Sequence, residues 1–129
     1  MSIKSRSRWV AAVIPAAVLA SAAPAALAHH SFAMFDANQT LTAKATVKEL
    51  QWGNPHTWLE LVVPGEDGSE KSLSLELNGL SGLRRNGWKP GTLKPGDKVT
   101  VTYHPLRDGK PAGQLVQLET EDGVQLKGQ

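Results

Sequence analysis

The chain has 129 residues, with 14 Lys and Arg against 12 Asp and Glu, and it contains no cysteine. This length provides one small domain with a modest core, and the missing cysteine excludes a disulfide framework and any thiolate site. The net charge of +2 comes from a basic start that cleavage would remove, so composition gives no reason to expect a nucleic-acid partner.

Residues 1–28 have the three parts of a secretory signal peptide. Three basic residues precede an apolar run at 9–20, and small residues then lead to an Ala-x-Ala pattern ending at Ala28. The run is too short and too rich in Ala for a stable membrane span, although an uncleaved segment would act as an anchor. Removing 28 of the 129 residues leaves 101, starting at His29, with 11 basic and 12 acidic residues. We therefore expect a periplasmic or secreted protein.

The first part of the mature chain predicts two strands. Apolar and polar residues alternate over 41–48, which indicates a strand with one buried face. The apolar positions then change parity at Leu50 and Trp52, which predicts a β-bulge or a bend. A Gly-Asn-Pro turn at 53–55 leads into a second strand over 58–63.

A third strand and a short helix follow a Pro/Gly-rich loop. Leucines alternate with polar residues over 71–77, so the leucines are expected to face inward and the polar residues, Glu76 among them, outward. Asn78 is expected to cap a helix of one or two turns, and Asn86 with Gly87 predicts a left-handed helix end.

The remaining elements complete an all-β pattern. Two strands are predicted over 98–104 and 114–120, then a terminal hairpin, with the last residues frayed. Three strands, a short helix and two or three strands is the order of a small OB-like β-barrel of five to six strands. A small β-sandwich is the alternative. We expect a single domain over 29–129 with an extended N-terminal segment, 29–38.

All four histidines lie in the mature chain and suggest a metal site. An N-terminal His29 can chelate copper(II) through its α-amine and its ring, because copper(II) favours nitrogen ligands in tetragonal geometry. Either His56 or His104 would complete a T-shaped site with three nitrogens, and His30 or Met34 would be an auxiliary ligand. The alternative is a solvated terminus, with the two later histidines bonded to loop carbonyls.

The aromatic residues suggest a second kind of site. Phe32, Phe35, Trp52 and Trp58 would form a stacking platform for a sugar ring, a lipid moiety or a partner loop if they were exposed together. Core packing is the alternative for these residues. Trp88 is expected to pack the helix exit against the barrel.

Catalytic signatures are missing from the sequence. It contains no Gly-x-Ser-x-Gly elbow, no cysteine nucleophile and no His-Glu-x-x-His motif. We therefore expect no catalytic residues, and copper is the only candidate cofactor. A redox enzyme using a histidine-bound metal is the least favoured hypothesis, because it would also need an open coordination position.

Four blocks of the chain, 29–36, 51–58, 79–88 and 93–109, carry a resemblance that covers nearly all of the mature sequence. They hold a His-His-Ser-Phe start, an Asn-Pro-His turn followed by Trp, and a His-Pro-Leu-Arg-Asp-Gly turn. Together they resemble the exported bacterial family catalogued as domain of unknown function 6152. The resemblance implies an envelope location and supplies no established substrate. All four histidines fall inside its blocks.

The leading functional hypothesis is an exported, non-catalytic binding or accessory protein with a copper site at the mature N-terminus and an envelope protein as its partner. The alternative is a protein or glycan adaptor that binds through the aromatic face.

Overall fold

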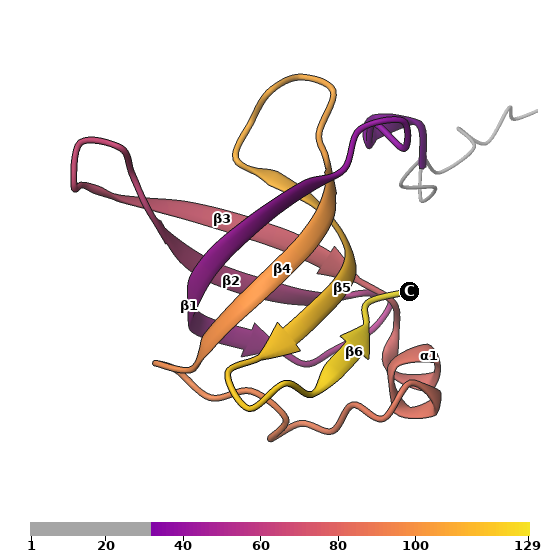
Figure 1. Ribbon diagram of the computed structural model, residues 1–129. Helices are drawn as coiled ribbons and strands as arrows, with labels where there is room; N and C mark the ends of the chain where they lie inside the picture. Colours follow the sequence, from indigo (N-terminus) through magenta and orange to yellow (C-terminus); the bar gives the residue numbers. More distant parts are fainter. Residues whose placement is uncertain (1–31) are drawn as a thin grey trace, which may run out of the picture.

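The computed structural model describes residues 32–129 (Figure 1). Among these residues no helix has the length and apolar character needed to cross a membrane. The interpretation of residues 1–28 as a signal peptide concerns residues outside those described. The elements are a 3₁₀-helix η1 (Phe32–Met34), the strands β1 (Leu41–Gln51), β2 (Thr57–Pro64) and β3 (Glu70–Leu77), the helix α1 (Leu80–Arg85), and the strands β4 (Lys98–Pro105), β5 (Ala112–Thr120) and β6 (Gln125–Lys127).

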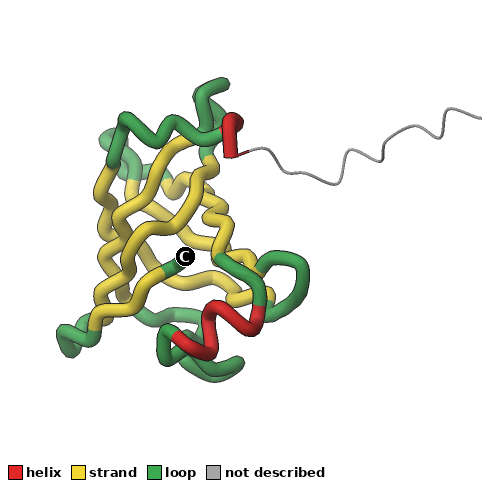
Figure 2. The backbone as a smooth tube through the Cα atoms, turned by 90° about the vertical axis from the view of Figure 1, so that its right-hand side faces the viewer, coloured by secondary structure: helices red, strands yellow, loops and turns green. Residues whose placement is uncertain are grey.

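The strands form one sheet that closes into a barrel (Figures 1 and 2). Their order is β3-β2-β1-β4-β5-β6, with antiparallel neighbours, and β3 also pairs in parallel with β5 through residues 74–76 and 112–114. This last pairing closes a five-stranded barrel, and β6 extends the sheet beside β5. With α1 between β3 and β4, the structure confirms the predicted OB-like barrel and excludes the sandwich.

The long strand β1 serves both halves of the barrel. Its first residues, Leu41 to Thr46, pair with β4, and the stretch from Thr46 to Gln51 pairs with β2. The register shifts between Val47 and Glu49, which confirms the bulge that the change of parity predicted. The bulge lets a single strand bend from one half of the sheet into the other.

The core fills the barrel interior with alternating strand residues, and the parity changes within β5, where Leu115 and Leu118 are both fully buried. Leu59 of β2, Leu75 of β3 and Leu115 of β5 are fully buried there, as is Val101 of β4. Side chains of the other parity therefore point to the outer face.

One end of the barrel is covered by α1 and the segment that follows it. Leu83 and Trp88 are buried, and the Trp88 indole Nε1 donates to the carbonyl oxygen of Lys127 at 2.8 Å. The expected cap by Asn78 is wrong, since the N-cap residue Gly79 makes no side-chain cap bond. The side-chain oxygen of the distant Asn54 accepts from the first helical backbone N–H instead, at 3.0 Å.

The C-terminal residues are paired, so the expected fraying is also wrong. The Gly128 backbone N–H donates to the carbonyl oxygen of Val116 at 3.0 Å, and the carbonyl oxygen of Gly128 accepts from Asn78 at 2.8 Å. These bonds hold the chain end against β5 and the end of β3.

Trp88→Ala should lower the free energy of unfolding by about 3–5 kcal/mol, because it removes a large buried side chain and leaves the Lys127 carbonyl without its donor. The change is measured by urea unfolding followed by circular dichroism. Val124→Ala is the control, since Val124 is 49% exposed and its truncation should change stability by less than about 0.5 kcal/mol. An equal effect of the two substitutions would contradict the role given to Trp88.

Candidate functional site

Four side chains lie in one lateral row across the outside of the barrel. The strand register pairs Trp58 of β2 with Glu76 of β3, Glu76 with Gln114 of β5, and Gln114 with His104 of β4. Laterally paired residues point to the same face, and Leu75 beside Glu76 points into the core, so the four face outward. We call them the outer-face row. Adjacent strands lie about 4.8 Å apart, which places the backbones of Glu76 and His104 about 10 Å apart.

Glu76 is buried although it faces outward. Its exposed fraction is 3%, and its Oε1 contacts Nδ1 of His56. The His56 side chain is 32% exposed while its Nδ1 is buried, so the exposed part of the ring lies away from the carboxylate. The second oxygen of Glu76, Oε2, is buried and has no hydrogen-bond partner among residues 32–129.

The loop that carries His56 is held by the start of α1. The Asn54–Pro55 peptide bond is cis, and the Asn54 side chain is the acceptor for Leu80 described above. The loop backbone also packs against Gly79, where a Cβ atom would lie 2.7 Å from the carbonyl oxygen of Pro55. His56 therefore extends from a fixed loop toward the outer-face row.

His104 is also fixed through Nδ1. This nitrogen lies 2.8 Å from the carbonyl oxygen of Gln39. A carbonyl only accepts, so Nδ1 carries the proton and the lone pair of the neutral ring is on Nε2. The neighbouring strand packs closely here, since a Cβ atom on Gly113 would lie 2.5 Å from the carbonyl oxygen of His104. An imidazole with Nδ1 held by an oxygen is typical of metal-ligating histidines.

The segment before β1 is anchored to the turn that follows His104. The Asp36 backbone N–H donates to the carbonyl oxygen of Pro105 at 2.8 Å, and the Arg107 backbone N–H donates to that of Met34 at 3.0 Å. The Arg107 Nε donates to the carbonyl oxygen of Ala33 at 2.9 Å, and its guanidinium lies 3.6 Å from the Asp36 carboxylate. Figure 1 shows η1 beside the turn between β4 and β5. The described part of the chain thus begins beside the turn that follows His104.

Among the described side chains, the candidate aromatic residues do not share one face. Phe35 is 4% exposed and forms a β-bridge with Leu106, and Trp52 packs against the core. Trp58 lies on the outer-face row, and the side chain of Phe32 is outside those described. Trp88 is in the core, as predicted.

The candidate metal ligands are only partly placed. His29 and His30 lie outside the described residues, and Met34 is 37% exposed on the anchored segment. Among residues 32–129 no three His, Asp or Glu side chains gather into a metal-binding cluster.

The role of Glu76 was missed from the sequence, where alternation placed it among outward polar residues. Glu76 is far from the Asn-Pro-His loop in the sequence, so no local pattern indicates their contact.

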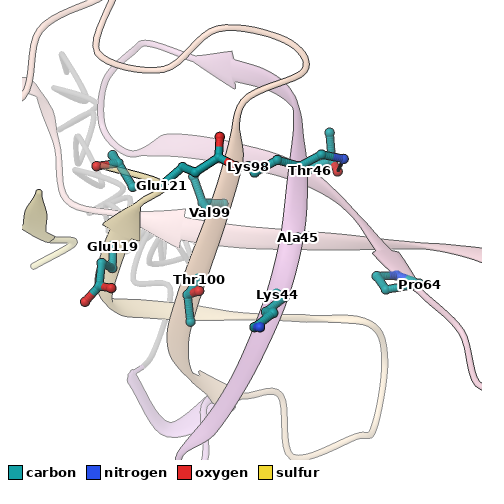
Figure 3. Close-up of a pocket in the computed structure, with 10 residues that line it drawn as sticks. Lys44, Ala45, Thr46, Pro64, Lys98, Val99, Thr100, Glu119 and Glu121 are labelled. Atoms are coloured by element: carbon teal, nitrogen blue, oxygen red, sulfur yellow. Dashed lines mark hydrogen bonds between the residues drawn. The ribbon is translucent and has the colours of Figure 1, made fainter. Parts of the chain in front are cut away.

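Two concave regions have no histidine among their lining residues. A groove of about 380 Å³ crosses β1, β4 and β5 between basic and acidic side chains (Figure 3), and there Lys98 Nζ donates to Thr46 Oγ1 at 2.7 Å. A second region, of about 390 Å³, lies beneath the turn between β4 and β5. Tyr103 lines it, and burial raises the pKa of the Tyr103 phenol.

Comparison with known proteins gives one match. The model of a family of unknown function (DUF6152) matches residues 16–116. Neither a curated protein nor a solved structure matches the chain.

His56→Ala should lower the free energy of unfolding by about 1–3 kcal/mol, because it leaves the buried carboxylate of Glu76 without its partner. Glu76→Gln should compensate part of that loss, so a double-mutant cycle in urea should give a coupling energy above about 0.5 kcal/mol. Additive effects of the two substitutions would contradict a stabilising contact between these side chains.

Proposed function

The chain belongs to the family of unknown function DUF6152, and we propose that it is an exported, non-catalytic protein of the cell envelope whose mature N-terminus binds copper(II). The signal-peptide pattern of residues 1–28 supports export, and cleavage after Ala28 would make His29 the first residue. An envelope protein that delivers or receives the metal would be the partner.

The anchored segment beside His104 is the observation that carries this proposal. Three peptide units separate Phe32 from His29, and an extended chain covers about 3.3–3.6 Å per residue, so His29 can reach about 10 Å from the anchor. His104 has its Nδ1 occupied by the Gln39 carbonyl and its lone pair on Nε2. The terminal α-amine, the His29 ring and His104 would then give copper(II) three nitrogens.

The remaining candidates have auxiliary roles in this site. The thioether of Met34 lies on the anchored segment and would suit copper(I), and His30 follows the chelating residue directly. Copper affinity should weaken as the pH falls, because protons compete with the metal for amine and imidazole nitrogens.

Calorimetric titration of copper(II) into tag-free protein beginning at His29 should show one-to-one binding. A Gly-Ser-Gly-Ser extension before His29 keeps every side chain but moves the α-amine, and should weaken binding by more than about tenfold, or about 1.4 kcal/mol. His29→Ala and His104→Ala should each weaken copper binding to a comparable degree. Zinc(II) is titrated in parallel. Unchanged copper affinity in the extended form would refute the terminal chelate.

The anchor itself can be tested without touching a ligand. Arg107→Ala removes the hydrogen bond to the Ala33 carbonyl and the ion pair with Asp36, so the terminal segment loses part of its preorganisation. Copper affinity should fall by about three- to tenfold. Lys110→Ala on the same turn is the matched control and should leave it unchanged, because Lys110 pairs only locally with Asp108. Equal copper affinities of the two variants would show that the anchor does not contribute to metal binding.

A further inference from the structure

We infer that one end of the barrel binds a small carboxylate with an apolar body, in the concave region beneath the turn between β4 and β5. Its volume of about 390 Å³ lies within the range of pockets that hold small molecules. It uses none of the nitrogens proposed for copper, so the inference goes beyond the proposed function. We call this region the barrel-mouth pocket, and its lining includes Asp36, Leu41, Leu73, Tyr103, Arg107 and Lys110.

The two ends of the barrel are covered to different extents. α1 and Trp88 cover one end, and Figure 1 shows the turn between β4 and β5 at the opposite end. There Tyr103 pairs with Leu41 on one side and with the fully buried Leu115 on the other, so all three hold interior positions. Leu41 is nevertheless 37% exposed. The described chain therefore leaves apolar surface of the barrel interior uncovered at this end.

The inner lining of the barrel-mouth pocket is apolar and fixed. Leu73 belongs to the core with 5% exposure, and the Tyr103 ring packs against that core. A Cβ atom on Gly113 would lie 2.6 Å from Cδ2 of Tyr103, so the ring rests directly on the backbone of β5. An alkyl or aryl group placed here would lose contact with water against a preformed apolar surface.

The Tyr103 hydroxyl supplies a hydrogen-bond donor within this lining. Burial raises the pKa of the phenol, so the hydroxyl keeps its proton at neutral pH. Among residues 32–129 no group bonds to this hydroxyl. A tyrosine hydroxyl that is partly buried usually has a partner, and an oxygen of a bound ligand would accept from it.

The charges around the pocket favour an anion. Arg107 and Lys110 line it together with a single acidic residue, Asp36, whose carboxylate lies 3.6 Å from the Arg107 guanidinium. Lys110 pairs with Asp108 at 3.4 Å, but both side chains are more than half exposed, and exposed pairs of this kind are weak. A ligand carboxylate can therefore compete for Lys110, and guanidinium groups such as that of Arg107 bind carboxylates through paired hydrogen bonds.

These features together select the class of ligand. A carboxylate would accept from the Tyr103 hydroxyl and meet the two cations, while its apolar body would cover Leu41. An ammonium ion with the same apolar body would be repelled by the cations, and an alcohol would lose the charge-assisted hydrogen bonds. The pocket should therefore distinguish molecules that differ only in their polar group.

The test is fluorine NMR of the protein labelled with 3-fluorotyrosine and titrated with hexanoate at neutral pH, without copper. Tyr103 is the only tyrosine in the chain, so one resonance reports on the pocket. Hexanoate should shift this resonance until the site is saturated. Hexylammonium and hexanol carry the same alkyl body and should bind at least about tenfold more weakly. An unchanged resonance with hexanoate, or equal affinity for hexylammonium, would overturn the inference.

Two pairs of variants locate the bound hexanoate. Arg107→Gln should weaken its binding about tenfold, whereas Lys98→Gln removes the same charge at the other end of β4 and should leave it unchanged. Leu41→Asp should bind hexanoate about tenfold more weakly than Leu41→Asn, which has the same size without the charge. Equal affinities within either pair would overturn the assignment of the pocket. The Leu41 pair decides the matter even if Arg107→Gln loosens the segment before β1.

Discussion

The parallel pairing of β3 with β5 is the contact on which the rest of the structure depends. It spans only residues 74–76 and 112–114, yet it turns an open antiparallel sheet into a closed barrel. Closure removes most of the exposed strand edges that a small domain without disulfides would otherwise present. The same pairing sets Glu76 beside Gln114, so the outer-face row exists only because the barrel closes at this register.

Much of this fold follows from local pattern in the sequence. A period of two marks β1 and β3, and the change of parity at Leu50 marks the bulge, because inward and outward positions are set by the pleat. The end of α1 at Asn86 and Gly87 also follows locally, since Gly87 has a φ of 86° that favours glycine. Neighbouring residues in the sequence are enough to determine these features.

The errors and omissions arise where distant segments meet. The start of α1 uses the side chain of Asn54, which is 26 positions from its partner, and no capping preference of Asn78 reveals this. The C-terminal residues pair with β5 because unsatisfied carbonyls and N–H groups are available there. Glu76 faces outward as alternation predicts, but a loop residue from before β2 covers it. The candidate site was therefore recognised through its histidines and not through the acid that holds one of them. Its first two histidines lie outside the described residues.

The close packing at Gly113 constrains the distance between β4 and β5. A Cβ atom on Gly113 would lie 2.5 Å from the carbonyl oxygen of His104, so only glycine fits at this point of β5 without a shift of β4. A single methyl group at this position would push β4 outward and widen the gap between the two imidazole-bearing positions without altering either imidazole. The geometry of the outer face is thus adjustable in evolution through a residue that has no functional group of its own.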